Sequence, residues 1–260
     1  MTTEYEPEYI SVSRINAYSG SFGCPKRYFF SYVMGLRSRW TGASLAIGSG
    51  IGRALQSIKA INAGDPLAVW MGEWEDYCHK TWDGIDPDVD REAMVSKGAD
   101  MLRALYTAGV HNVTGIPECE IVDAVIHCPD TGEELPPLVG YMDWYCPITH
   151  RVTELKTGRS IANWENHLVQ LAVYRWAATK PEAPPSVELI QVNKSKAPKV
   201  ERQVVTITDN QEKWVMAAIA KTVRAIRAGH FPERPSYACR SCEFRGACQE
   251  GDYSGLVEKH

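Results

Sequence analysis

The chain has 260 residues, of which 44% are hydrophobic and 23% are charged, and its formal net charge is −4. This composition is typical of a globular protein with a packed core and excludes a disordered, highly charged chain. The sequence has no uninterrupted apolar run of about 18 residues and no apolar stretch near its acidic N-terminus. We therefore expect an intracellular, cytoplasmic protein without a membrane partner, in which the eight cysteines bind metal or are buried rather than form four disulfides.

The first half of the chain is predicted to be mostly helical. Ser11 or Ser13 can cap a short helix, which an aromatic run, RYFFSYVMGL, follows. Three further segments have apolar residues at helical spacing, namely 47–63, 67–82 and 91–108.

The second half alternates strands and helices. Segments with strand-like patterns are 118–128, 138–146, 151–157, 186–194 and 199–207. A helix is predicted over 163–180, with Asn163 as its N-cap, and another over 209–229, closed by Gly229. This order predicts an α/β fold with a mixed central sheet flanked by helices, a helical N-terminal part and a C-terminal cap.

The two strands around the sequence PITH (147–150) place three charged residues together. If these residues form a hairpin loop, Cys146 pairs with Arg151 and Asp143 lies opposite Glu154. Lys156 lies two residues further along and therefore on the same face. Facing carboxylates favour a divalent cation such as Mg²⁺ or Mn²⁺, although a surface cluster of charges would give the same pattern.

Three cysteines lie within ten positions near the end of the chain, in SYACRSCEFRGACQE (236–250). A metal or cluster site normally needs four ligands, and a C-x₂-C spacing suits both Zn²⁺ and a 4Fe–4S cluster. A further cysteine lies near the start of the chain, at position 24. The other four are most simply interpreted as buried thiols: Cys78, Cys119, Cys128 and Cys146.

Taken in order, GYMD, ELK and the helical QLAVY resemble the RecB-like branch of the PD-(D/E)xK nuclease superfamily. The early CPKRYFFSYVMGL resembles the N-terminal motif of its iron–sulfur members, such as CRISPR-associated exonucleases and AddB-type nuclease domains. The resemblance covers roughly 11–250 and implies a restriction-endonuclease-like core. On this resemblance, the chain is a single nuclease domain (1–260). It has a helical part at 11–115, a core at 116–229 and a cluster-binding cap at 230–260.

The resemblance also implies roles for individual residues. The catalytic metal would be held by Asp143, Glu154 and the carbonyl of Leu155, and Lys156 would act on the attacking water or on the transition state. Gln170 and Tyr174, which share a helix face, would contact DNA or steady the site. The implied cluster ligands are Cys24, Cys239, Cys242 and Cys248.

One position departs from the family pattern. Members usually have a histidine in an early helix within G-x-x-x-H, where this chain has IGSGIGRALQSI and Gly52 at the expected position. Arg53 and Gln56 are poor replacements, and three other residues are candidates for the missing ligand: His167, Glu118 and Glu120.

Basic residues suggest where DNA would bind. The segments 24–39 and 194–202 are rich in lysine and arginine, and they supply the candidates Lys26, Arg27, Arg37, Lys194 and Lys196. No nucleotide-binding G-x-x-x-x-G-K-[ST] motif occurs, so the protein would need single-stranded DNA, a free end or a partner such as a helicase or a recombination or adaptation protein.

Three functions remain open from the sequence. The first is a metal-dependent DNA exonuclease with a structural 4Fe–4S cluster. The second is a weakly active or inactive DNA-binding adaptor of the same fold, for which the glycine at position 52 is the best support. The third is a zinc-binding α/β protein whose charged triad decorates its surface.

Overall fold

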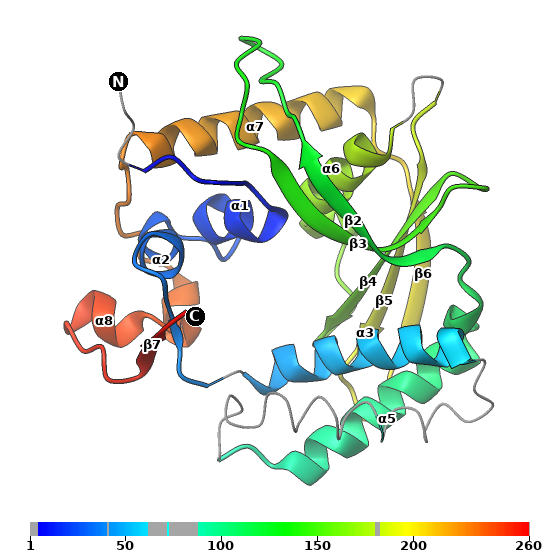
Figure 1. Ribbon diagram of the computed structural model, residues 1–260. Helices are drawn as coiled ribbons and strands as arrows, with labels where there is room; N and C mark the ends of the chain where they lie inside the picture. The colour runs from blue at the N-terminus through cyan, green and yellow to red at the C-terminus, as the bar shows by residue number, and fades with distance from the viewer. Residues whose placement is uncertain (1–4, 41, 62–71, 73–87, 180–182, 260) are drawn as a thin grey trace.

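A mixed β-sheet forms the centre of the molecule (Figure 1). The computed structural model describes residues 5–40, 42–61, 72, 88–179 and 183–259. Within these residues the sheet has five strands in the order β2-β3-β4-β5-β6; β4 and β5 run parallel and the other neighbours antiparallel. The strands are β2 (Ile116–Ala124), β3 (Leu138–Cys146), β4 (Arg151–Gly158), β5 (Ser186–Asn193) and β6 (Val200–Val205).

Helices cover both faces of this sheet, which confirms the predicted fold class (Figure 1). On one face, α1, α6 and α7 enclose a core that includes Val152, Leu171 and Leu189. On the other, α3 and α5 pack against Trp144 and Leu155. These helices are α1 (Val12–Ser19), α3 (Ala43–Ile61), α5 (Arg91–Thr107), α6 (Leu168–Ala178) and α7 (Asp209–Arg227), and a short 3₁₀ turn, η3 (Val110–Asn112), follows α5.

The predicted elements differ from the observed ones mainly at their ends. The side chain of Ser11 caps α1 by accepting the N–H of Arg14, and Gly229 follows α7 with a φ of 67°. The helix expected from 163 begins instead as a 3₁₀ turn, η4 (Trp164–His167), because Asn163 accepts the N–H of Glu165 and so caps that tighter turn. The helix expected at 67–82 lies outside the described residues.

The first and last segments of the chain form a separate cap beside the sheet (Figure 1). Here a two-stranded antiparallel sheet joins β1 to β7, which the sequence patterns did not predict. Phe30 stacks on Phe244 with ring centroids 5.4 Å apart, and both side chains are buried. The cap contains α2 (Pro25–Tyr28), the π-helical η1 (Phe29–Val33), β1 (Leu36–Ser38), η5 (Tyr237–Ser241), α8 (Arg245–Gln249) and β7 (Leu256–Glu258).

The aromatic residues of the N-terminal segment differ in burial. Tyr28 and Phe30 belong to the core, whereas Trp40 is exposed. In the part of the chain that the structure describes, no helix combines the length and apolar character needed to cross a membrane.

Candidate active site

The hairpin register predicted from the sequence is confirmed where β3 and β4 pair. Cys146 pairs with Arg151, Tyr145 with Val152 and Trp144 with Thr153. The ladder ends before Asp143 and Glu154, which are therefore not backbone partners as expected. Instead, the backbone N–H of Leu155 donates to Oδ2 of Asp143 at 2.7 Å, so a side chain replaces the next rung of the ladder.

Glu154 lies at the centre of the site and is only 2% exposed. Its Oε1 accepts hydrogen bonds from Nζ of Lys156 at 2.5 Å and from Nε2 of Gln170 at 2.8 Å. Its other oxygen, Oε2, is buried and has no hydrogen-bond partner among the described residues. A carboxylate oxygen buried in this way is costly, because it has lost water without gaining another partner.

Helix α6 supports the site from one side. Gln170 donates from Nε2 both to Glu154 and, at 3.0 Å, to the hydroxyl of Tyr174. That hydroxyl in turn donates to the backbone carbonyl of Tyr141 on β3 at 2.7 Å. The i, i+4 pair predicted on the helix therefore links Glu154 of β4 to the backbone of β3 and fixes the orientation of the carboxylate.

The carboxyl groups titrate abnormally because they are buried together. Burial raises the pKa of Glu154 to about 8; the charge of Asp143 adds to this rise, and Lys156 opposes it. Burial also raises the pKa of Asp143, against the effects of its hydrogen bond from Leu155 and of the nearby Lys156. The single ammonium of Lys156 does not offset the burial of these carboxyl groups, and a bound divalent cation would supply further positive charge.

A cleft of about 830 Å³ opens beside these residues. One side is formed by the sheet, including Asp143 and Lys156, and the other by α3, which presents Gly48 and Gly52. A Cβ atom added at Gly52 would have no heavy atom within 4 Å, so the space above this position is open. The remaining lining residues are Ser44, Leu45, Ser49, Arg53, Glu118, Leu155, Thr157 and Lys194.

The candidate replacements for the missing histidine lie in different places. Glu118 lines the cleft, whereas Glu120 is exposed and accepts a hydrogen bond from the hydroxyl of Tyr141 at 2.7 Å. His167 has a buried, unpartnered Nε2, and burial and the nearby Lys156 lower its pKa. Across the described residues, no three His, Cys, Asp or Glu side chains are close enough together as placed to hold a single metal ion.

Lys194, one of the residues predicted to bind DNA, lines the cleft. Lys194 follows β5, and its Nζ donates to the carbonyl of Ser44 at the start of α3 at 2.8 Å. Sequence reasoning assigned Lys194 to DNA but missed that it shares a cleft with Asp143 and Lys156. The glycines of GSGIG in α3 were the available sequence signal for an open helix face along this cleft.

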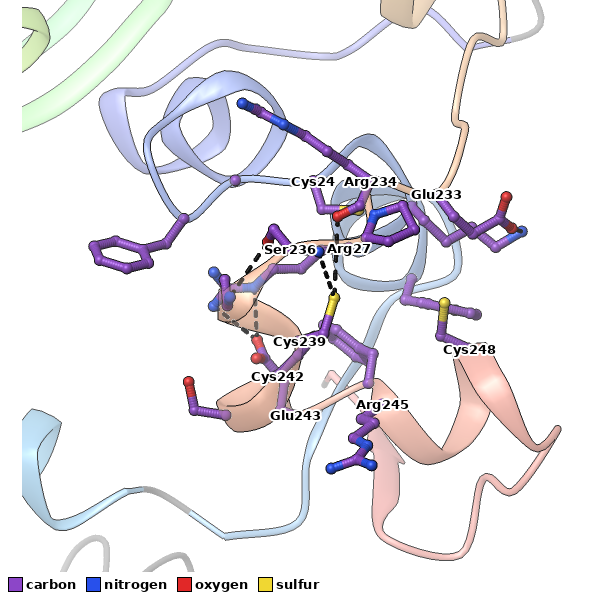
Figure 2. A pocket seen from close by; sticks show the side chains of 18 of the residues that line it. Cys24, Arg27, Glu233, Arg234, Ser236, Cys239, Cys242, Glu243, Arg245 and Cys248 are labelled. Atoms are coloured by element: carbon purple, nitrogen blue, oxygen red, sulfur yellow. Dashed lines mark hydrogen bonds and ion pairs between the residues drawn. The ribbon is translucent and has the colours of Figure 1, made fainter.

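The four cysteines of the predicted cluster site line one cavity of about 330 Å³ in the cap (Figure 2). Figure 2 shows Cys24, which precedes α2, facing Cys239 and Cys248 across this pocket. Burial raises the pKa of the Cys242 thiol, so its thiolate form needs positive charge nearby. Of the remaining cysteines, Cys128 and Cys146 are buried and Cys119 is half-buried, while Cys78 lies outside the described residues.

Two of the basic residues predicted to bind DNA line this cysteine pocket instead of the cleft. Arg27 forms an ion pair with Glu243 at 2.9 Å, and Lys26 forms one with Glu233 at 3.4 Å. Both acids come from the C-terminal segment, so these pairs connect the two halves of the cap. The other candidates are separate from them: Arg37 lies on β1, and Lys196 is exposed in the loop after β5.

Residues 9–249 match the family model of the PD-(D/E)XK nuclease superfamily. The chain belongs to this superfamily. Its sheet, with a carboxylate on each of two adjacent strands and a lysine two residues after the second, carries the elements of the superfamily's name. Membership supports the core of the sequence resemblance, although it does not extend to the iron–sulfur cluster or to the CRISPR-associated and AddB-type members.

Two solved structures were compared with the fold. The crystal structure of a "Putative exonuclease" from Eubacterium rectale matches with a TM-score of 0.63 and 14% identity, covering 94% of each chain. The crystal structure of SSO0001 covers 82% of this chain and 87% of its own, with 14% identity and a TM-score of 0.39, which is too low to carry an argument. At these identities the first match shows the fold alone. No curated protein matches the sequence.

Proposed function

We propose that this nuclease is a divalent-metal-dependent DNA exonuclease with a structural 4Fe–4S cluster. The observation that carries the proposal is Oε2 of Glu154, which is buried and has no partner among the described residues, near a second, half-buried carboxylate, Asp143. A cation there would be a partner for this oxygen and would stabilise the charged forms of both carboxylates, which burial disfavours. The donor set therefore fits the Mg²⁺ or Mn²⁺ that nucleases of this superfamily generally use.

Each residue of the proposed site would have its own role. Asp143, Glu154 and the carbonyl oxygen of Leu155 would hold the ion, which supplies Lewis acidity and an activated water when bound. Lys156 would stabilise the negative charge that develops on the phosphate, because its ammonium lies beside Glu154. Gln170 would position Glu154, and Tyr174 would position Gln170.

The cleft between α3 and the sheet would take the DNA strand. Lys194 lies in the cleft and Lys196 is exposed two residues further on, so both are placed to contact phosphates on either side of the cleaved bond. Arg37 would extend this contact if the strand passes the cap. The preference for ends rests on the description of the Eubacterium rectale protein as an exonuclease, to which this chain has a similar fold.

We favour a 4Fe–4S cluster over a zinc ion as the group bound in the cysteine pocket. Zinc needs four sulfur atoms about 2.3 Å from one point. The described cysteines surround a cavity of about 330 Å³, and no three of them approach one another closely enough to hold a single ion. A 4Fe–4S cluster is larger, and its ligands lie further apart, so Cys24, Cys239, Cys242 and Cys248 would bind it from the walls of this cavity.

One observation favours the second function, a DNA-binding adaptor with weak or no catalysis. Helix α3 presents Gly52 to the cleft and thus offers no metal donor at this position. With fewer protein ligands, the ion would be held more by water and would bind more weakly. The intact set of Asp143, Glu154 and Lys156 supports the nuclease over the adaptor.

Degradation of end-labelled single- and double-stranded DNA tests the proposal. We expect cleavage with Mn²⁺ or Mg²⁺, none with EDTA, and a loss of about a thousandfold in Glu154→Ala, since a catalytic metal is worth several kcal/mol. Glu201→Ala, which removes an exposed carboxylate on β6, is the matched control and should cleave normally. Cleavage that survives both EDTA and Glu154→Ala would contradict the proposal, and folded wild-type protein without any cleavage would favour the adaptor.

A further inference from the structure

The proposed metal site has too few protein donors within the cleft. Asp143 and Glu154 supply one carboxylate each, and Lys156 already occupies Oε1 of Glu154. On the opposite wall, Gly48 and Gly52 carry no side-chain donor. A hard divalent cation takes at least six oxygen ligands, so any further carboxylate in the cleft becomes important.

Glu118 is such a carboxylate, and its position in the sheet is unusual. In the ladder between β2 and β3, Pro117 pairs with Trp144 and Cys119 with Met142, which leaves Glu118 opposite Asp143. Its φ is 45°, in the left-handed region that a residue with a side chain adopts only at a cost in free energy. This conformation accompanies a side chain that lines the cleft together with Asp143, Leu155 and Lys156.

A second observation, independent of Glu118, points to a bound cation. Glu154 is more than nine-tenths buried, and its Oε2 has no hydrogen-bond partner among the described residues. Asp143 lies on the neighbouring strand β3, between Glu154 of β4 and Glu118 of β2 in the order of the sheet. A divalent cation would supply the partner that this buried oxygen lacks.

We propose that Glu118 is the third carboxylate ligand of the divalent cation and takes the place of a donor from α3. This inference rests on the proposed function, because it assumes that Asp143 and Glu154 bind the ion. As placed, the three carboxylates do not surround a single point. The side chain of Glu118 is exposed, and a change of rotamer toward Asp143 would let it bind the ion directly or through one of the ion's waters.

The other two candidates fit less well. Glu120 lies two residues further along β2, does not line the cleft, and accepts a hydrogen bond from the hydroxyl of Tyr141. His167 lies near Lys156 on the α6 side and is also absent from the cleft lining. Glu118 is therefore the candidate that shares the cleft with both Asp143 and the open space above Gly52.

The test measures Mn²⁺ binding to metal-depleted protein by titration calorimetry and by the electron paramagnetic resonance signal of free Mn²⁺. It compares wild type with Glu118→Gln, Glu120→Gln and Asp143→Asn. We expect Asp143→Asn to abolish binding at the site and Glu118→Gln to weaken it by about tenfold or more. Glu120→Gln, a matched change two residues away on the same strand, should bind as wild type does.

Thermal unfolding of the same variants supplies a readout that does not depend on activity. In EDTA, Glu118→Gln should melt at or slightly above the wild-type temperature, because it removes a like charge beside Asp143. With saturating Mn²⁺, the rise in melting temperature should be smaller than in wild type.

Two results would overturn the inference; the first leaves the proposed function in place and the second does not. If Asp143→Asn loses Mn²⁺ while Glu118→Gln and Glu120→Gln both bind normally, Glu118 is not a ligand and the proposed function stands. If wild type binds no Mn²⁺, or if Asp143→Asn binds it unchanged, the proposed metal site itself is wrong and the role of Glu118 is lost with it.

Discussion

The proposed active site and the cysteine pocket are assembled from chain segments at very different separations. The residues of the proposed active site all lie within one hairpin and the helix after it, namely Asp143, Glu154, Lys156, Gln170 and Tyr174. In the cysteine pocket, Cys24 meets residues from 239–248, which are more than 200 positions away in the sequence. Local backbone geometry builds the first site, whereas the second forms only when the N-terminal and C-terminal segments of the chain pack together.

This contrast suggests that the two sites depend on the fold in different ways. The carboxylates and lysine are held by short-range hydrogen bonds, such as those from Gln170 and Leu155. The cap is held by long-range contacts, among them the β1–β7 pairing and the stack of Phe30 on Phe244. A cluster bound by the four cysteines would add a covalent cross-link to these contacts.

The largest effect is expected from Cys24→Ala. The variant should lose its iron, measured by metal analysis and visible absorbance, and much of its stability. A cross-link that closes a loop of this length is worth about 5 kcal/mol by analogy with disulfides. Cys119→Ala, which removes a half-buried thiol on β2, should keep its iron. A soluble Cys24→Ala protein with a full complement of iron would exclude Cys24 as a ligand. It would also show that the cluster does not join the two ends of the chain.

A smaller effect is expected from pH in the metal-free protein, and it reports on the cleft alone. The pKa of Glu154 is about 8 in the folded state against 4.5 ordinarily, so the folded protein retains a proton that the unfolded chain has released. The free energy of unfolding should therefore be highest below the lower value and fall as pH rises toward 8, by up to about 1.4 kcal/mol per pH unit.

Chemical denaturation in EDTA at about pH 5.5 and pH 8 measures this change. Glu154→Gln cannot titrate and should show a flatter dependence, and saturating Mn²⁺ should protect wild type at the higher pH by taking the place of the proton. Equal wild-type stability at both pH values would show that Glu154 is solvated rather than buried beside Asp143.

The smallest effects concern the wall of the cleft formed by α3. Gly52→Ala should raise the free energy of unfolding by up to about 1 kcal/mol, since alanine favours a helix over glycine and the added Cβ meets no atom within 4 Å. Gly48→Ala is the matched change one turn earlier, and its Cβ would lie 2.8 Å from Oγ1 of Thr157, so its gain should be smaller or reversed. Chemical denaturation of both variants measures the change in the free energy of unfolding. Equal changes would show that the space at Gly52 is no more open than the space at Gly48.

The sequence by itself determined much of the cleft. Strand alternation and the position of the turn at 147–150 set the pairing of Cys146 with Arg151 and brought Asp143, Glu154 and Lys156 to one end of the hairpin, because register follows from local geometry. The helical spacing of Gln170 and Tyr174 likewise put them on one face. The sequence did not predict that the pairing of β3 with β4 ends before Asp143. It ends there because the backbone N–H of Leu155 donates to the side chain of Asp143 instead of to a backbone carbonyl.

Only the tertiary structure decided which distant residues enter each site. It placed Lys194 and Glu118 in the cleft, joined Lys26 and Arg27 to acids of the C-terminal segment, and paired β1 with β7. No periodicity encodes these contacts, because they arise from packing between elements that are far apart in the sequence. Local hydrogen-bonding geometry thus fixes the carboxylate pair and its lysine, and the packing of the whole chain determines what surrounds them.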